Sequence, residues 1–139
     1  ATKVDFSQIK SPETYIGLAR RENFVKDANE LNLNEWTLKG DFDESNEKIV
    51  TSSEISSIMM KFKASKVNIV LGGYGEAEIY IDGKLATQEN AGKDVIDGKM
   101  KIDGNRLYEL TNFGDKYEEH EIEIKFLDKE IELYAWTFG

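Results

Sequence analysis

The last nineteen residues, 121–139, read EIEIKFLDKEIELYAWTFG and alternate between apolar and polar side chains. Ile122, Ile124 and Phe126 are separated by charged residues, and a second alternating run begins at Ile131 after a short polar break. Successive side chains of a β-strand point to opposite faces, so this alternation predicts two strands that each bury one face. The end of the chain therefore indicates a β-domain.

Strand signals continue back along the chain as far as Glu35. We expect ten short strands, at residues 35–40, 47–51, 56–64, 66–72, 76–82, 84–88, 98–103, 105–111, 119–127 and 131–138. The pairs Asp82-Gly83 and Asp103-Gly104 suit the positive φ angles of tight hairpin turns, and both lie between predicted strands. Many short strands with little helix predict an all-β fold, an antiparallel β-sandwich of the jelly-roll kind.

The first part of the chain carries weaker signals. Residues 11–14 read as a turn, or as the start of a short helix with Ser11 as its N-cap. Residues 13–20 could continue that helix, although Gly17 weakens it. Residues 22–34 are polar and rich in asparagine, which predicts a loop. The sandwich is therefore expected to begin with a short helical or irregular segment.

Length and composition are those of one globular domain. The chain has 139 residues, of which 40% are hydrophobic and 32% are charged. We expect a single domain over residues 1–139, with residues 1–10 as a candidate linker. No apolar run approaches the ~20 residues of a membrane span, so no direct membrane insertion is expected.

The charge and the missing cysteine exclude several classes of function. Eighteen basic and twenty-seven acidic residues give a net charge of −9. That field disfavours nucleic acid and anionic membrane surfaces as partners, whereas neutral ligands such as sugars are compatible with it. The chain has no cysteine, which excludes disulfide bonds, thiolate zinc sites and thiol chemistry within it.

Three aromatic residues fall at alternate positions of the last predicted strand. Tyr134, Trp136 and Phe138 would therefore lie on one face of that strand. Flat aromatic faces stack on the apolar faces of pyranose rings, which makes Tyr134 and Trp136 candidate ligand-binding residues. The alternative is that these rings fill the core between the sheets while Leu133 and Ala135 face outward.

A second set of candidates lies in the N-terminal segment. Tyr15, Arg20 and Asn23 combine a ring with directional hydrogen-bond donors that suit sugar hydroxyls or a carboxylate. The alternative is that Arg20 binds backbone carbonyls and pins an irregular segment to the sandwich.

Trp36, Arg106 and Tyr108 complete the candidate ligand-binding residues. Trp36 opens the first predicted strand and is either a core residue or part of a ligand platform. Arg106 and Tyr108 alternate onto one face of their strand. If that face lines a groove, both belong to the site; otherwise Arg106 is a surface ion-pair partner of small energetic value.

Metal and catalytic signals are sparse. Asp41, Asp43 and Glu44 offer the oxygen ligands that calcium takes, but without the Asp-x-Asp-x-Asp-Gly spacing, so Asp41 and Asp43 are only secondary candidates for structural calcium. The single histidine, His120, makes a poor transition-metal site by itself. We find no nucleophile–base pair and no glycosidase spacing of carboxylates, so this domain is not expected to be an enzyme or to need a cofactor.

Several motifs resemble those of one known family. The matching stretches are SPETYIG at 11–17 with Arg20 and ENF at 22–24, LNEW at 33–36 with Leu38 and Gly40-Asp41, RLY at 106–108, FLD at 126–128, YA at 134–135 and TFG at 137–139. From about residue 7 to the C-terminus, the chain resembles the C-terminal carbohydrate-binding-module-like domain of DipZ-type membrane proteins. In these proteins a cytochrome c biogenesis-type membrane segment precedes a thioredoxin-like thiol-disulfide oxidoreductase domain, and the β-sandwich follows.

The resemblance implies a jelly roll of the galactose-binding type, held outside the cytoplasmic membrane in the periplasm or at the cell surface. It also implies that the chain is an excised C-terminal domain, because the thioredoxin-like part and its Cys-x-x-Cys are absent. The implied function is non-catalytic binding of a carbohydrate or cell-envelope glycan, which would hold the oxidoreductase near its target. The alternative is a protein-interaction or scaffolding domain that packs on the thioredoxin-like domain or presents its client proteins.

Overall fold

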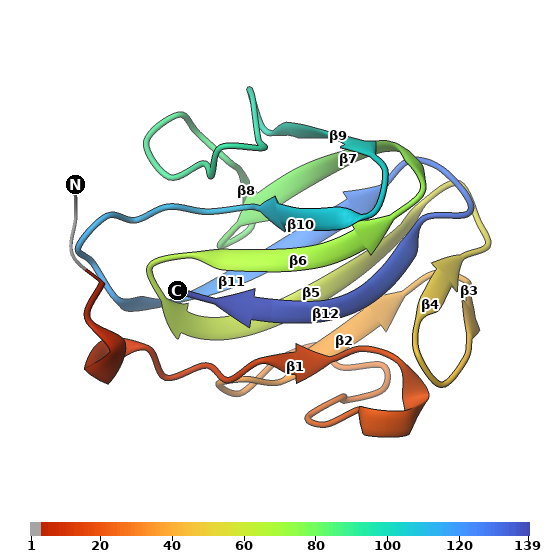
Figure 1. Ribbon diagram of the computed structural model, residues 1–139, viewed down its shortest axis with the longest axis horizontal. Coiled ribbons are helices and arrows are strands. Elements are labelled where there is room, and N and C mark those ends of the chain that lie inside the picture. Colours follow the sequence, from red (N-terminus) through yellow and green to blue (C-terminus); the bar gives the residue numbers. More distant parts are fainter. Residues whose placement is uncertain (1–3) are drawn as a thin grey trace.

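The computed structural model describes residues 4–139, which form two antiparallel β-sheets packed face to face (Figure 1). Sheet A has the strand order β10-β6-β12-β4-β3, with β1 paired to β12. Sheet B has the order β2-β5-β11-β7-β8, with β9 paired to β7. The prediction of an all-β antiparallel sandwich is confirmed. Within residues 4–139, no helix has the length and apolar character needed to cross a membrane.

Most of the strands are short. Those of sheet A are β1 (Thr14–Tyr15), β3 (Phe42–Glu44), β4 (Ile49–Thr51), β6 (Val67–Gly72), β10 (Arg106–Glu109) and β12 (Glu132–Phe138). Those of sheet B are β2 (Trp36–Lys39), β5 (Ser56–Ala64), β7 (Tyr74–Ile81), β8 (Lys84–Leu85), β9 (Lys99–Asp103) and β11 (Glu118–Phe126). Two 3-10 helices, η1 (Phe6–Gln8) and η2 (Leu18–Arg20), flank β1. The sequence signals missed β1 and β3.

The core lies between the sheets and follows the period-two alternation of the longest strands. In sheet B, β5 and β11 pair along their whole lengths. Their inward residues, among them Ile58, Met60, Ile122 and Ile124, are at most 1% exposed. Burying each such side chain is worth about 1.5–3 kcal/mol. The alternation in the sequence therefore identifies the face of β11 that stabilises the fold.

Strand β12 breaks this alternation because it contains a β-bulge. Its register shifts between Leu133 and Ala135, which leaves Tyr134 as an extra residue. Leu133 and Trp136 are both fully buried, although a regular strand would place them on opposite faces. The prediction that Tyr134, Trp136 and Phe138 share one face is therefore wrong. The alternative that these rings fill the core holds for Trp136, and Phe138 packs against the core, but Leu133 does not face outward.

The N-terminal segment does not form the helix considered for residues 11–20. Residues 14–15 form β1, which adds a short strand to sheet A beside β12. Ser11 does not cap a helix: its hydroxyl donates to Asn34 Oδ1 (2.6 Å) and accepts from the backbone N–H of Lys63 (2.8 Å). These contacts with distant residues replace the local hydrogen bond that a helix cap would make.

Only the first of the two Asp-Gly turns closes a hairpin. Asp82-Gly83 joins the paired strands β7 and β8 with φ angles of 52° and 81°. Asp103-Gly104 instead carries the chain from β9 in sheet B to β10 in sheet A. The Tyr108 hydroxyl fixes this corner, because it accepts from the Asp103 N–H (2.9 Å) and donates to the Gly104 carbonyl (2.6 Å). The second predicted hairpin is therefore wrong.

Candidate functional site

The outward faces of the two sheets differ in chemistry. On sheet B, four lysines lie directly opposite four glutamates of neighbouring strands, in the pairs Lys61–Glu121, Lys63–Glu119, Lys99–Glu78 and Lys101–Glu76. Exposed pairs of this kind are worth about 0–1 kcal/mol each and remain hydrated. The outward face of sheet B is therefore dominated by mutually compensating charges.

Three rows of residues cross the outward face of sheet A, which we call the open face. Residues directly opposite one another share a face. The register therefore defines the rows Glu109–Asn68–Thr137, Leu107–Val70–Ala135–Tyr15 and Gly72–Glu132–Val50–Asp43. The middle row is apolar except for one hydroxyl, and the bulge places Tyr134 next to it. The strands that carry this row form the front layer of Figure 1.

Tyr15 and Arg20 meet at one end of the middle row. The Arg20 guanidinium carbon lies 3.7 Å from the centroid of the Tyr15 ring. The Tyr15 hydroxyl donates to Glu13 (2.7 Å), and this hydrogen bond raises the pKa of Tyr15. Both residues line a hollow of about 440 Å³ beside η2. Two of the predicted site residues are thus brought into direct contact.

Lys48, Glu132 and Tyr134 form a polar cluster on the open face. The Glu132 carboxylate accepts from the Tyr134 hydroxyl and lies 3.4 Å from the Lys48 ammonium. The Tyr134 hydrogen bond lowers the pKa of Glu132. Burial, together with the same hydrogen bond, raises the pKa of Tyr134. At neutral pH the cluster therefore holds an ion pair next to a protonated, half-exposed tyrosine.

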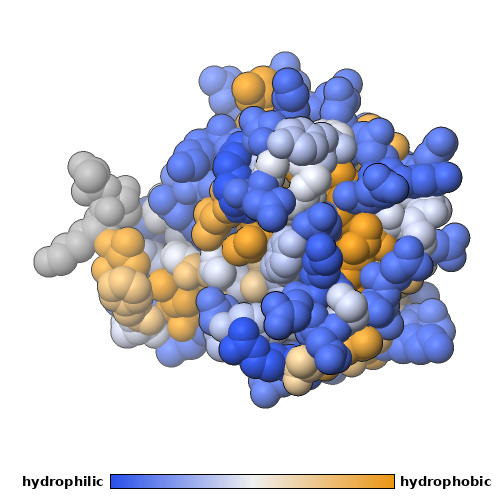
Figure 2. Space-filling model, turned by 45° about the vertical axis from the view of Figure 1, so that its right-hand side comes forward, coloured by the Kyte–Doolittle hydropathy of each residue, from blue (hydrophilic) through white to orange (hydrophobic). Residues whose placement is uncertain are grey.

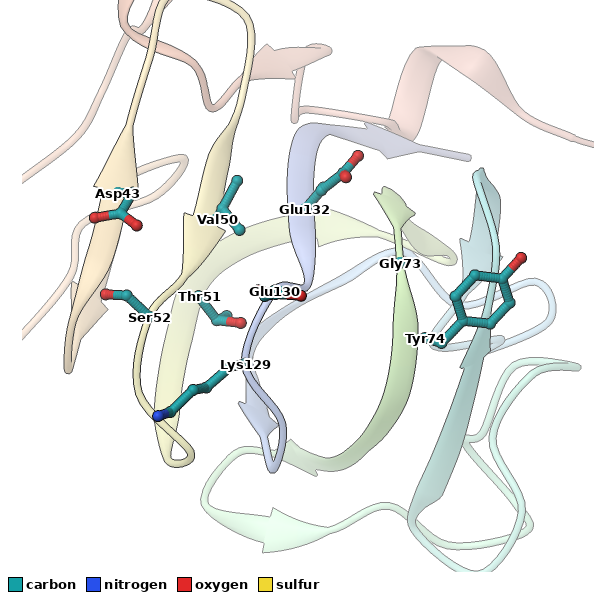
Figure 3. Close-up of a pocket in the computed structure, with 9 residues that line it drawn as sticks. All are labelled: Asp43, Val50, Thr51, Ser52, Gly73, Tyr74, Lys129, Glu130 and Glu132. Carbon is teal, nitrogen blue, oxygen red and sulfur yellow. The ribbon is translucent and has the colours of Figure 1, made fainter.

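A groove of about 710 Å³ lies at the end of the open face, where β3 and β4 approach three turns of the chain. Figure 3 shows Asp43 and Ser52 on one side of it, Tyr74 on the other, and Val50, Thr51 and Glu132 between them. In Figure 2, which brings this end of the molecule forward, the exposed hydrophobic groups form small separate patches among hydrophilic ones. The groove is thus lined mainly by polar residues, and the Tyr74 ring at its edge points away from them.

Three of the predicted ligand-binding aromatics are core residues. Trp36, Tyr108 and Trp136 are all 0% exposed, so none of them can stack on a ligand at the surface. The Trp36 indole N–H donates to the Glu22 carbonyl (2.8 Å), which ties the N-terminal loop to β2. Trp136 faces inward because of the bulge. These three residues stabilise the core of the sandwich. The prediction that they bind a ligand is therefore wrong.

Arg106 and Asn23 lie apart from the open face. Arg106 donates to Asp94 (3.0 Å) and Asp103 (3.2 Å), and its guanidinium carbon lies 3.9 Å from the Tyr108 ring centroid. The hydrogen bond from Arg106 lowers the pKa of Asp103. These contacts match the ion-pair alternative. Asn23 adopts a positive φ of 62°, and its carbonyl accepts from Trp36, so its clearest contribution is to the loop backbone.

The acidic loop considered for calcium proves to be part of an edge strand. Asp43 lies in β3 opposite Val50, and Asp41 precedes that strand. Among residues 4–139, no group of three or more His, Cys, Asp or Glu side chains is arranged to hold a metal ion. Asp43 instead contributes its carboxylate to the groove.

Sequence comparison assigns the family. Residues 11–139 match the family described as "Thioredoxin like C-terminal domain". The chain belongs to this family. No curated protein sequence matches it significantly. The match includes every strand of both sheets, so the open face and the groove both lie within the thioredoxin-like C-terminal domain.

Solved structures with the same fold include family two carbohydrate esterases. The enzyme from Cellvibrio japonicus superposes with a TM-score of 0.59 at 16% identity, over 74% of this chain and 30% of the esterase. The enzyme from Clostridium thermocellum, solved in complex with cellohexaose, gives a TM-score of 0.58 at 14% identity, over 75% of this chain and 31% of the esterase. The thioredoxin-like C-terminal domain thus shares its fold with less than a third of each esterase.

The groove residues of this thioredoxin-like C-terminal domain escaped the sequence analysis, apart from Asp43. Tyr74 follows Gly72-Gly73, a pair that reads only as a flexible loop. Ser52, Lys129 and Glu130 lie in turns, where polar residues are expected whatever their function. Only the pairing of β12 with β4 and β6 brings these separate turns together.

Proposed function

We propose that this chain is a non-catalytic glycan-binding module, joined in its parent protein to an extracytoplasmic thioredoxin-like thiol-disulfide oxidoreductase of the DipZ type. Family membership supports the association with a thioredoxin-like domain. The sandwich fold, shared with an esterase that was solved with cellohexaose, supports the glycan as ligand. The location outside the cytoplasmic membrane is part of the proposal and follows from the sequence resemblance.

The apolar row on the open face is the observation that carries this proposal. Leu107, Val70, Ala135 and Tyr15 cross the strands in one line, with Tyr134 beside them. A saccharide chain presents apolar C–H faces between its hydroxyl groups, so it can lie along this row. Polar side chains of the two flanking rows could then bond its hydroxyls. On the outward face of sheet B, the corresponding row Met59–Glu123–Tyr80–Leu85 is interrupted by a charged residue.

Calorimetric titration of the purified chain with glycans selected from an array tests the proposal. A shallow open face should bind with a Kd between about 1 μM and 1 mM. We expect Tyr134→Ala to weaken binding at least about tenfold, because stacked ring surface and a hydrogen-bonding hydroxyl are both lost.

Tyr80→Ala is the matched control. Tyr80 lies on the outward face of sheet B and donates to Glu78 (3.2 Å), two residues earlier, much as Tyr134 donates to Glu132. Binding that Tyr80→Ala removes and Tyr134→Ala retains would place the ligand on the other sheet. If no glycan binds the unaltered chain, the proposal fails.

A second candidate function is docking on the thioredoxin-like domain. Phe6 is 79% exposed and Val4 is 48% exposed, close to where Tyr117 holds the backbone of Asp5 (3.0 Å). Two exposed apolar residues, Phe6 in η1 and Val4 just before that helix, suit contact with another domain. We expect Phe6→Ser to weaken binding of the purified thioredoxin-like domain without affecting glycan titrations.

A further inference from the structure

The short helix η2 is fixed against the β3–β4 turn at the end of the open face. The Ala19 N–H donates to the Asn46 carbonyl in that turn (3.0 Å). A Cβ on Gly17 would lie 2.5 Å from the same carbonyl oxygen, so only glycine fits this close approach. Figure 1 shows η2 as the coil next to the end of the β3–β4 hairpin. Arg20, the last residue of η2, is therefore carried by a backbone that is tied down.

The two neighbouring arginines of this segment differ in their contacts. Arg21 has a side chain that is 12% exposed, donates to the Ile16 carbonyl (3.0 Å) and forms an ion pair with Glu44 (3.0 Å). Arg20 forms no ion pair with any residue from 4 to 139. Its guanidinium carbon lies 3.7 Å from the centroid of the Tyr15 ring, and this stacking orients the group while most of its five N–H donors stay free. Arg20 is therefore an oriented donor that the described chain does not use.

Carboxylates lie next to this free donor. Glu13 accepts from the Tyr15 hydroxyl (2.7 Å) and keeps further acceptor positions, because a carboxylate has about four. Glu22 lines the same hollow of about 440 Å³, and Glu47 lines a smaller hollow of about 100 Å³ that also contains Tyr15 and Arg20. Three carboxylates thus lie around one free guanidinium group. Such a site disfavours an anion and suits a neutral group that both accepts and donates.

We propose that Arg20 and Glu13 bind a neutral sugar unit through two neighbouring hydroxyl groups, at the Tyr15 end of the open face. This inference rests on the proposed glycan-binding function and names the ligand class of one subsite. A hydroxyl can accept from the guanidinium while it donates to a carboxylate, whereas the carboxylate of an acidic sugar could only accept. The parallel N–H groups of a guanidinium match two adjacent oxygen atoms. The rest of the glycan would extend from Tyr15 along the apolar row, towards Val70 and Leu107.

Small glycosides test these contacts one at a time by NMR titration. The probes are the methyl α-glycosides of glucose, galactose and mannose, which orient their neighbouring hydroxyls differently, their fully O-methylated forms, and methyl α-glucuronide. We expect at least one of the three glycosides to shift the Arg20 Nε–H and backbone amides of residues 13–22, with a Kd of about 1 mM or weaker. Its O-methylated form can only accept, and should bind at least about tenfold more weakly. The inference is wrong if none of the three shifts these resonances, or if the glucuronide binds more tightly than all of them at low salt.

Three variants test the arginine itself. Arg20→Lys keeps the charge but loses the paired N–H groups, so it should weaken the best glycoside at least about fivefold, and Arg20→Ala should weaken it further. The control Lys129→Ala removes the same charge as Arg20→Ala, from the turn before β12, and should leave the affinity unchanged. Because Arg20 forms no ion pair, both of its variants should unfold at the temperature of the unaltered chain. Full affinity in Arg20→Lys would overturn the paired contact, and equal losses in Arg20→Ala and Lys129→Ala would show an effect of net charge alone.

The same titrations separate this subsite from the glycan-binding function. An array glycan that binds, loses affinity in Tyr134→Ala and shifts no resonance of residues 13–22 would support binding on the open face and refute the subsite. No hit on the glycan array, together with no shift by any of the glycosides, would refute both.

Discussion

Substitution of Trp136 is the most direct test of which residues belong to the core. Trp136 is fully buried, and its indole N–H has no hydrogen-bond partner within the described chain. Trp136→Ala should lower the free energy of unfolding by about 3–5 kcal/mol, because it leaves a large cavity. Trp136→Phe fills most of the space and removes the unpaired N–H, so it should cost less than half as much.

Guanidinium denaturation of both variants measures these costs. Tyr134→Ala is the control at a half-exposed neighbour and should cost no more than about 1.5 kcal/mol. A Trp136→Ala protein as stable as the unaltered chain would contradict the burial.

Glu132 makes the stability depend on pH in the acid range. The hydrogen bond from Tyr134 lowers the pKa of Glu132 below its ordinary value of 4.5. A carboxylate with a lower pKa in the folded state stabilises the protein above its unfolded-state pKa. This contribution is lost as the pH falls through the folded-state pKa. The stability advantage of the unaltered chain over Glu132→Gln should therefore be constant above about pH 6 and shrink below pH 4.5. Thermal unfolding at a series of pH values measures it, and an advantage that does not change with pH would refute the linkage.

At the scale of elements, the bulge in β12 should tolerate a deletion that a regular strand cannot. Tyr134 is the extra residue between Leu133 and Ala135, so removing Ala135 leaves a regular ladder with Trp136 still facing inward. Removing Val70 from β6 would instead turn either Ile69 or Leu71, both 0% exposed, outward. We expect the Ala135 deletion to keep a cooperative transition and the Val70 deletion to prevent folding, as measured by circular dichroism and heating. Equal damage from both would contradict the bulge register.

The elements also show where sequence reasoning succeeds. Strands β5 and β11 follow from the sequence because each carries its own period-two signal over nine residues. The bulge in β12 has no comparable signal, so a strict alternation wrongly grouped Trp136 with Tyr134 on one face. The region of strand β1 was interpreted as a turn or a helix start because Ser11 resembles a helix N-cap. In the structure the Ser11 hydroxyl bonds the distant residues Asn34 and Lys63 instead. Tyr15 and Arg20 were identified together because they lie in one segment, whereas the groove joins turns that only the sheet order brings close.

At the scale of the whole molecule, the outward faces of the two sheets differ in charge and in apolar surface. Sheet B pairs its surface charges with one another, which favours hydration and leaves few free groups. Sheet A keeps an apolar row, two half-exposed tyrosines and an acidic groove on one continuous surface. Charged residues thus keep the outward face of sheet B hydrated, whereas the open face of sheet A is the one proposed to bind a ligand. Because the core lies between the sheets, we expect that side chains of the open face can be changed without unfolding the domain.

This division predicts an unusual fluorescence response. Trp36 and Trp136, the two tryptophans, are both 0% exposed between the sheets, whereas the proposed ligand contacts tyrosines such as Tyr15 and Tyr134 on the outside. Saturating glycan should therefore leave tryptophan emission unchanged, although calorimetry under the same conditions reports binding. Guanidinium should shift the emission to the red in one step, together with unfolding. A glycan-induced shift that Trp36→Phe or Trp136→Phe removes would show that the ligand reaches the core, and would refute binding on the open face.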